Sequence, residues 1–207
     1  MNLIIIPVIT NNNYKCEANL TNLTRFTMRG GVTVSKISIE KIGITNTGAE
    51  AVVNAANEWL QEGSGVCGVI FKAAGSSRLT RACDNIGHCD TGKAVLTPGY
   101  NLSKYIIHAV GPVWKGGDRE EAKLLYGAYY SSLELCIEND IHSIAFPLIS
   151  AGIFGYPSDK AWHKALQACN DFIAKNPDFD IDITFAVIDD RILAEGLAEQ
   201  KLQSIDL

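Results

Sequence analysis

The chain has 207 residues, of which 47% are hydrophobic, and this fits a single globular domain with a substantial core. Its formal net charge of −5 argues against a general nucleic-acid-binding protein, because such proteins carry a basic face. The six cysteines are scattered and form no CxxC pair, so we expect reduced thiols and a cytoplasmic location.

The first thirty residues differ in pattern from the rest of the chain. The apolar run MNLIIIPVIT lacks a basic segment and a cleavage site, and it is too short to cross a membrane. We therefore expect neither a signal peptide nor a membrane partner. Residues 1–30 are an added edge strand, a loose extension, or a stretch ahead of a true start at Met28, and the sequence leaves these alternatives open. The main domain is predicted at 31–207.

From Val32 onward, short apolar runs alternate with helical periodicity. Strands are predicted at 32–39, 51–54, 94–96, 105–110, 143–148 and 181–188. Helices are predicted at 66–74, 78–83, 120–138 and 191–202, and a further helix begins with Ser158 as its N-cap. The alternation predicts an α/β protein whose mixed, mainly parallel sheet is covered on both faces. Ligands of such sheets bind beyond the carboxyl ends of the strands.

A glycine-bearing loop follows the predicted strand that ends in VVNAAN. Residues 63–68 read GSGVCG and lead directly into a helix. Glycines let the backbone approach a ligand closely, and the free amides of a helix N-terminus bind phosphate. Asn57 lies where the strand has just ended, and its amide can both donate and accept hydrogen bonds, which suits a sugar diol. The alternative is a structural turn that joins the strand to the helix.

A second glycine-bearing loop, residues 150–157, reads SAGIFGYP and follows the strand predicted at 143–148. Gly152 and Gly155 expose backbone amides just before a helix, and Phe154 between them is placed to cover a ligand ring or sugar. The alternative for Phe154 is a core contact beneath the loop. Neither loop matches the dinucleotide or P-loop fingerprint, so the expected ligand contains phosphate but is not a nucleoside triphosphate with magnesium.

Five ordered segments resemble the macro domain family: VVNAAN, GSGVCGVIFKAAG, TGKAVLTPGY, YIIHAVGP and SIAFPLISAGIFGYP. The resemblance covers residues 32–190. It implies a three-layer α/β/α sandwich with a mixed, mostly parallel central sheet that binds ADP-ribose in a cleft. Some family members only bind ADP-ribose, whereas others remove it from proteins or deacetylate O-acetyl-ADP-ribose. We therefore expect ADP-ribose or ADP-ribosylated proteins as partners, no cofactor, and a monomer.

By position, the resemblance implies that Asn57 contacts the ribose next to the scissile bond and places the attacking water. Residues 63–66 wrap this ribose and the diphosphate, residues 150–154 hold the diphosphate through backbone amides, and residues 188–189 lie by the adenine. The implied substrate-binding residues are Ile44, Asn54, Gly63, Ser64, Gly65, Val66, Cys67, Ser150, Ala151, Gly152, Ile153, Phe154, Ile188 and Asp189.

Three positions depart from the family pattern. Cys67 stands where many hydrolytic members have an aspartate, which is their favoured general base. The segment 42–45, IGIT, lacks the aspartate that usually lies beside the adenine amino group, and Asp189 is a candidate to replace it. Ser64 replaces the middle glycine of the first loop, so that loop is expected to differ slightly in shape.

Other chemistries are disfavoured by residue context. Cys67 as a nucleophile would need His88 or His108 as its base, but His108 is expected to be a satisfied core histidine and Cys67 a small packing residue. No metal site is predicted, because no compact zinc pattern fits the candidates Cys67, Cys83, His88 and Cys89.

The acidic pairs 120–121 and 189–190 are interpreted as solvated helix ends rather than acid–base couples. The predicted function is hydrolysis of ADP-ribosyl bonds on proteins, or deacetylation of O-acetyl-ADP-ribose. The attacking water would be placed by Asn57 and activated by the ligand diphosphate, because positioning alone supplies a large share of a barrier reduction. The alternative is a non-enzymatic module that recognises ADP-ribosylated proteins.

Overall fold

The computed structural model describes residues 35–203. The predictions for residues 1–30, and the strand residues predicted at Val32 and Val34, lie outside this described part of the chain.

A six-stranded sheet forms the centre of the molecule, in the order β1-β6-β5-β2-β4-β3. The antiparallel pair β3–β4 lies at one edge, and all other neighbours are parallel, which confirms the prediction of a mixed, mostly parallel sheet. The strands are β1 Lys36–Lys41, β2 Ala51–Ala56, β3 Ala94–Pro98, β4 Tyr105–Val110, β5 Ser143–Phe146 and β6 Asp182–Val187.

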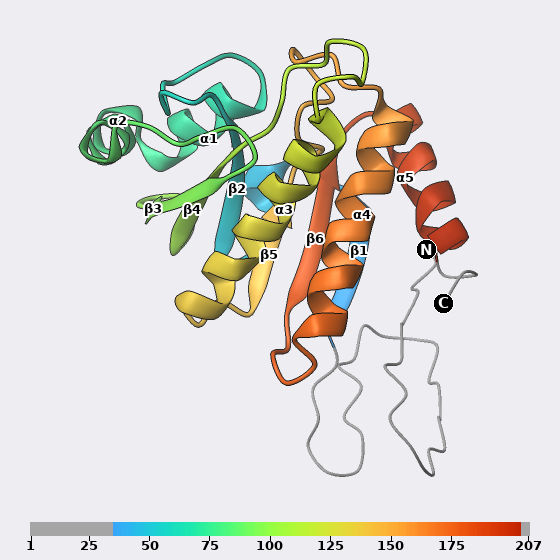
Figure 1. Cartoon of the computed structure of the whole chain (residues 1–207). Helices are drawn as coiled ribbons and strands as arrows, with labels where there is room; N and C mark the ends of the chain where they lie inside the picture. The colour runs from blue at the N-terminus through green and yellow to red at the C-terminus, as the bar shows by residue number, and fades with distance from the viewer. Residues whose placement is uncertain (1–34, 204–207) are drawn as a thin grey trace.

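Helices cover both faces of this sheet, as Figure 1 shows. The short helices α1 and α2, with the 3-10 turn η1, pack on one face, and the longer α3 and α4 pack on the other, while α5 lies beside α4 and β1. The fold is therefore a three-layer α/β/α sandwich, as predicted. The bounds are η1 Ile44–Asn46, α1 Val66–Ala74, α2 Ser76–Ile86, α3 Glu121–Glu138, α4 Ser158–Lys175 and α5 Asp190–Gln203.

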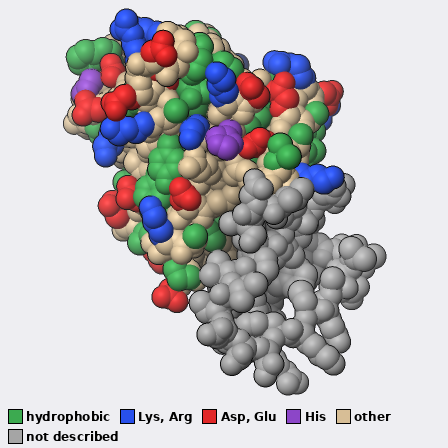
Figure 2. Space-filling model, turned by 45° about the vertical axis from the view of Figure 1, so that its right-hand side comes forward, with side chains coloured by type: hydrophobic (Ala, Val, Ile, Leu, Met, Phe, Trp, Pro, Cys, Tyr) green, Lys and Arg blue, Asp and Glu red, His purple; other side chains and the backbone are tan. Residues whose placement is uncertain are grey.

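The strands are continuously apolar because both faces of the sheet are buried. In β4, Ile107 and Ala109 point into the core cluster beneath α3 and α4, whereas Ile106 and Val110 point into the cluster beneath α1 and α2. The surface is mixed by contrast. Hydrophobic, acidic and basic side chains are interspersed over the face shown in Figure 2.

Neighbouring strands β2 and β5 send the chain to opposite faces of the sheet. After β2 the chain enters α1 on one face, and after β5 it enters α4 on the other. The two strands pair only at 51–52 with 144–145, so the loops that follow them separate. Ligands of α/β sheets bind where connections part in this way. Both glycine-bearing loops lie at the carboxyl ends of these two strands (Figure 1).

Element boundaries differ from the predicted ones in places that have local causes. β5 ends at Phe146 rather than 148, because Pro147 has no N–H to donate to a neighbouring strand. α4 has Pro157 as its N-cap, so the prediction that Ser158 caps it is wrong, and Ser158 is the first helical residue instead. Within 35–203, no helix is both long and apolar enough to span a membrane.

Candidate functional site

The first loop ends at a bare helix N-terminus. Gly65 adopts φ 63° and ψ −138°, a conformation that is open to glycine alone, and it caps α1 without a side-chain hydrogen bond. The first amides of a helix have no partner within the helix, so those of α1 remain free to bind an anion. Ser64 is not among the residues with positive φ, so this replacement brings no left-handed strain to the loop.

The thiol of Cys67 holds the first loop closed. Its Sγ lies 3.3 Å from the backbone nitrogen of Gly63, which donates to it, and the residue is only 6% exposed. Burial raises the pKa of the thiol and outweighs the opposing effects of the Gly63 N–H and the Asn54 side chain. A neutral thiol is a poor nucleophile and a poor base. The geometry therefore favours the packing role predicted for Cys67.

The amide of Asn57 is largely used by its own loop. Its Oδ1 accepts hydrogen bonds from the backbone N–H groups of Trp59 and Gln61, each at 3.1 Å. Its Nδ2 donates to the carbonyl of Gln61 at 2.9 Å. An asparagine amide has two N–H donors and two acceptor positions on its oxygen, so one N–H remains for a ligand or water. Asn57 thus shapes the loop as well as being the predicted catalytic residue.

A buried polar chain lies directly beneath this loop. Thr97 contacts Nε2 of His108 at 3.0 Å, and Nδ1 of His108 lies 3.2 Å from Nδ2 of Asn54. Burial lowers the pKa of His108 to about 4, so the ring is neutral and accepts from the Asn54 amide at Nδ1. His108 is thus a satisfied core histidine, as predicted. The bond fixes the orientation of Asn54, whose buried Oδ1 has no hydrogen-bond partner among the described residues.

The second loop presents three neighbouring amides. Ser150 has φ 64° and packs against Gly111, where an added Cβ would lie 2.2 Å from the Ser150 Oγ. Its carbonyl accepts from Tyr156 at 3.0 Å and closes the loop. The N–H groups of residues 152–154 form no hydrogen bond with any residue in the described part of the chain. They are therefore available to an anion such as a diphosphate.

The predicted adenine-side residues lie at the ends of β1 and β6, two neighbouring strands. Ile188 is 76% exposed, whereas the side chain of Ile44 is buried in the core under α1. Asp189 accepts the N–H of Ile192 at 2.9 Å through Oδ1 and so caps the start of α5. The carboxylate of Asp189 keeps a second oxygen that could accept a hydrogen bond from a ligand.

Residues 53–165 match the family model of the macro domain. The chain belongs to the macro domain family. It is 51% identical over 143 residues to an uncharacterized protein of Fusobacterium nucleatum, a match that covers 69% of this chain and 81% of that protein. It is 47% identical over 146 residues to an O-acetyl-ADP-ribose deacetylase of Salmonella gallinarum, covering 68% and 81% respectively. The structure of an Oceanobacillus iheyensis macrodomain with ADP is similar at a TM-score of 0.79 and 32% identity, covering 84% of this chain and 94% of that one.

The structural roles of Trp114 and Glu121 in this macro domain were not predicted from the sequence. Trp114 donates its backbone N–H to the carbonyl of Phe154 at 2.8 Å, and its ring meets that of Tyr156 edge-on at 4.7 Å. Glu121 is only 2% exposed, so its interpretation as a solvated helix end is wrong. Its carboxylate accepts from three backbone N–H groups of the segment that follows Trp114, those of Lys115, Gly117 and Arg119.

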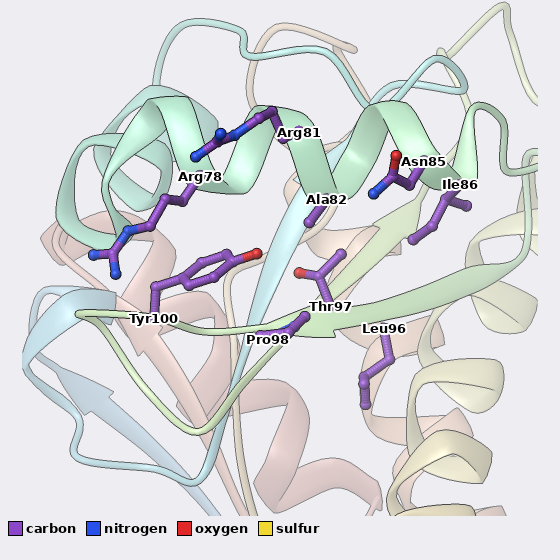
Figure 3. A pocket seen from close by; sticks show the side chains of 9 residues that line it. All are labelled: Arg78, Arg81, Ala82, Asn85, Ile86, Leu96, Thr97, Pro98 and Tyr100. Atoms are coloured by element: carbon purple, nitrogen blue, oxygen red, sulfur yellow. The ribbon is translucent and has the colours of Figure 1, made fainter.

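A separate groove of about 600 Å³ lies between α2 and β3 (Figure 3). Arg78 lies at one end of it, donates to Oδ1 of Asn101 at 2.6 Å, and lies over the ring of Tyr100. None of the predicted site residues lines this groove, so it is distinct from the candidate site. Its lining residues are Arg78, Arg81, Ala82, Asn85, Ile86, Leu96, Thr97, Pro98 and Tyr100.

The Glu121 carboxylate gives a pH-dependent prediction. Burial alone would raise its pKa, but backbone N–H donors outweigh burial and lower the pKa below the ordinary value of 4.5. The ion therefore stabilises the fold above pH 4.5, and this contribution is lost as the pH falls through the lowered pKa. We expect Glu121→Gln to reduce the free energy of unfolding at neutral pH, and its deficit relative to wild type to shrink in acid.

Urea denaturation at several pH values measures this difference. The exposed neighbour Glu120 provides the control, because Glu120→Gln should leave the free energy of unfolding nearly unchanged throughout. A deficit for Glu121→Gln that stays constant from neutral pH into acid would contradict the assigned role of the carboxylate.

Proposed function

We propose that this macro domain binds ADP-ribose where the loops that follow β2 and β5 diverge, and that it hydrolyses ADP-ribosyl bonds. The observation that carries the proposal is two stretches of backbone amides without hydrogen-bond partners in 35–203, at the uncapped N-terminus of α1 and at residues 152–154. Two such sites suit the two phosphates of a diphosphate. The Salmonella deacetylase and the ADP-bearing Oceanobacillus macrodomain support the same ligand class.

In this proposal the diphosphate lies along both loops, and the distal ribose lies between residues 63–66 and Phe154. The adenine extends toward Ile188 and Asp189 at the end of β6. Ser150 and Ala151 shape the second loop, whereas Asn54 supports the floor beneath the first. Most of the binding would come from backbone amides, which need no side-chain charge and therefore suit a chain with a net charge of −5.

The proposed reaction uses water and no cofactor. The remaining N–H of Asn57 holds the water, whose oxygen forms a bond to the anomeric carbon of the distal ribose. The bond from this carbon to the modified side chain breaks. A proton of the water passes to a diphosphate oxygen and then to the departing side chain. With an acetyl ester, the water oxygen instead forms a bond to the acetyl carbon, the bond from this carbon to the ribose oxygen breaks, and a water proton passes to that oxygen, so acetate and ADP-ribose are released. Positioning contributes most of the rate, because the neutral Cys67 thiol supplies no base.

A second function, binding of ADP-ribosylated proteins without hydrolysis, is favoured by the buried and neutral state of Cys67. Many hydrolytic members of the family carry an aspartate at this position, and here the side chain is a buried neutral thiol. A domain that only binds ADP-ribosylated proteins needs no base. Incubation of the protein with O-acetyl-ADP-ribose and with mono-ADP-ribosylated proteins of different linkages separates the two functions. Release of free ADP-ribose, or of acetate from the ester, supports the hydrolase. Binding without release of any product supports the non-enzymatic module that only recognises ADP-ribosylated proteins.

We expect Asn57→Ala to remove turnover and to weaken binding only in part. One lost hydrogen bond to a sugar hydroxyl is worth about 0.5–1.5 kcal/mol, which is roughly a two- to tenfold change in affinity. Since Asn57 also anchors the backbone of 59–61, circular dichroism should first establish that the variant is folded. Product release and ADP-ribose affinity are then measured in parallel.

The exposed Asn85 on α2 gives a matched control, because Asn85→Ala removes the same amide outside the candidate site. Full turnover by Asn57→Ala on every substrate would show that Asn57 does not position the water.

Cys67→Asp should raise turnover if the wild type lacks a protein base. A carboxylate at this position would also accept from the Gly63 N–H and lie in the first turn of α1, where negative charge is favourable. General-base catalysis is typically worth about 10²–10⁴-fold, and we expect a gain toward the lower end, because the carboxylate also repels the diphosphate.

Cys67→Ala should keep most of the turnover, since a packing thiol does no chemistry, and Cys67→Ser tests the loss of bulk while keeping an acceptor for Gly63. Initial rates of product release compare the three variants. If Cys67→Ala abolishes turnover while ADP-ribose still binds, the thiol takes part in the chemistry.

A further inference from the structure

An exposed aromatic pair lies beside the predicted catalytic residue. Trp59 donates its backbone N–H to Oδ1 of Asn57 at 3.1 Å, so the backbone of Trp59 is held next to that side chain. The residue is 64% exposed, and its ring meets the ring of His88 edge-on with centroids 5.0 Å apart. A tryptophan left in water has a large apolar area to bury, and tryptophan is enriched among the residues that dominate binding interfaces.

The two loops that carry this pair are fixed to each other. The carbonyl of Glu58 accepts from the N–H of Cys89 at 2.9 Å, and its carboxylate accepts from the hydroxyl and the N–H of Thr91 at 2.7 and 3.3 Å. Leu60, which follows Trp59, is 1% exposed and anchors the first loop to the core. A partner that binds the aromatic pair therefore meets a surface that is already ordered, which reduces the entropy lost on binding.

The charge of these two loops does not suit ADP-ribose itself. Residues 57–62 and 87–93 carry three exposed carboxylates, those of Glu58, Glu62 and Asp90, against the single lysine Lys93. Oδ1 of Asp90 lies 3.0 Å from Nε2 of His88, which ties this carboxylate to the aromatic pair. ADP-ribose is anionic through its diphosphate, and like charges repel. The acidic rim would instead favour a cationic group held just beyond the distal ribose.

We propose that Trp59 and His88, with this acidic rim, bind the polypeptide segment that carries the ADP-ribose and favour lysine and arginine beside the modified residue. The inference rests on the proposed function, because it places the distal ribose next to Asn57. A small ester such as O-acetyl-ADP-ribose has no group that reaches this surface. The aromatic pair therefore makes the site selective for modified proteins.

Binding measurements with defined ligands test this proposal. The ligands are free ADP-ribose, a peptide that carries ADP-ribose through a hydrolytically stable link between lysine and arginine residues, and the same conjugate with serine and glycine flanks. Wild type should bind the basic conjugate about tenfold more tightly than free ADP-ribose, the effect of one aromatic contact with charge complementarity. Trp59→Ala should remove this advantage and leave the affinity for free ADP-ribose unchanged.

Two further variants separate charge from apolar contact. The double substitution Glu62→Gln with Asp90→Asn should abolish the preference for basic over neutral flanks, and added salt should have the same effect. Ile137→Ala is the matched control, because Ile137 is an exposed apolar residue in the last turn of α3, at the amino ends of the strands.

The outcomes distinguish this inference from the function on which it rests. Absence of ADP-ribose binding by wild type contradicts the proposed function. Equal affinity of wild type for free ADP-ribose and both conjugates overturns the inference alone. An equal loss of affinity for all ligands in Trp59→Ala also overturns it, because Trp59 would then support the ADP-ribose site rather than contact the polypeptide.

Discussion

The separation of the chain after β2 and β5 is the constraint on which the site depends. Helices cover both faces of the sheet, so the connection after each strand packs on one face or the other. The connections after the neighbouring strands β2 and β5 pack on opposite faces. The two strands pair with each other only at 51–52 and 144–145, and the loops that follow their ends at Ala56 and Phe146 diverge. One loop ends at the uncapped start of α1 and the other exposes the amides of 152–154. Backbone geometry, rather than charged side chains, thus supplies the free amides that we propose bind the diphosphate.

Burial decides which side chains near these loops can do chemistry. Desolvation keeps both the thiol of Cys67 and the ring of His108 neutral, because it raises the pKa of the thiol and lowers the pKa of the ring. His108 then orients Asn54 by accepting its amide, and Cys67 closes the first loop by accepting the Gly63 N–H. Two residue types that often act as catalysts serve here as structural supports. The chemistry that we propose is therefore left to Asn57, to water and to the ligand itself.

The fold was predictable from local pattern, whereas the use of individual polar groups was not. Continuous apolar strands, helical periodicity and glycines at strand ends are all visible within a short window of sequence. The buried state of Glu121 depends on the path of the segment after Trp114, which no local pattern encodes. The saturation of Asn57 by its own loop depends on the turn that 57–61 adopt, so the sequence predicted a freer amide than the structure contains.

The claim that these two loops bind a diphosphate is tested most directly by calorimetric titration of ADP-ribose into variants of Gly152 in the second loop. A Cβ at Gly152 would meet nothing within 4 Å, so substitutions there should leave the protein folded. Wild type should bind ADP-ribose more tightly than AMP or ribose 5-phosphate, since only the full ligand occupies both loops and the ribose pocket. Gly152→Glu should abolish ADP-ribose binding. Gly152→Gln, which adds similar bulk without charge, should weaken binding less, and Gly152→Ala should retain binding. An unchanged affinity for ADP-ribose in folded Gly152→Glu would contradict the account.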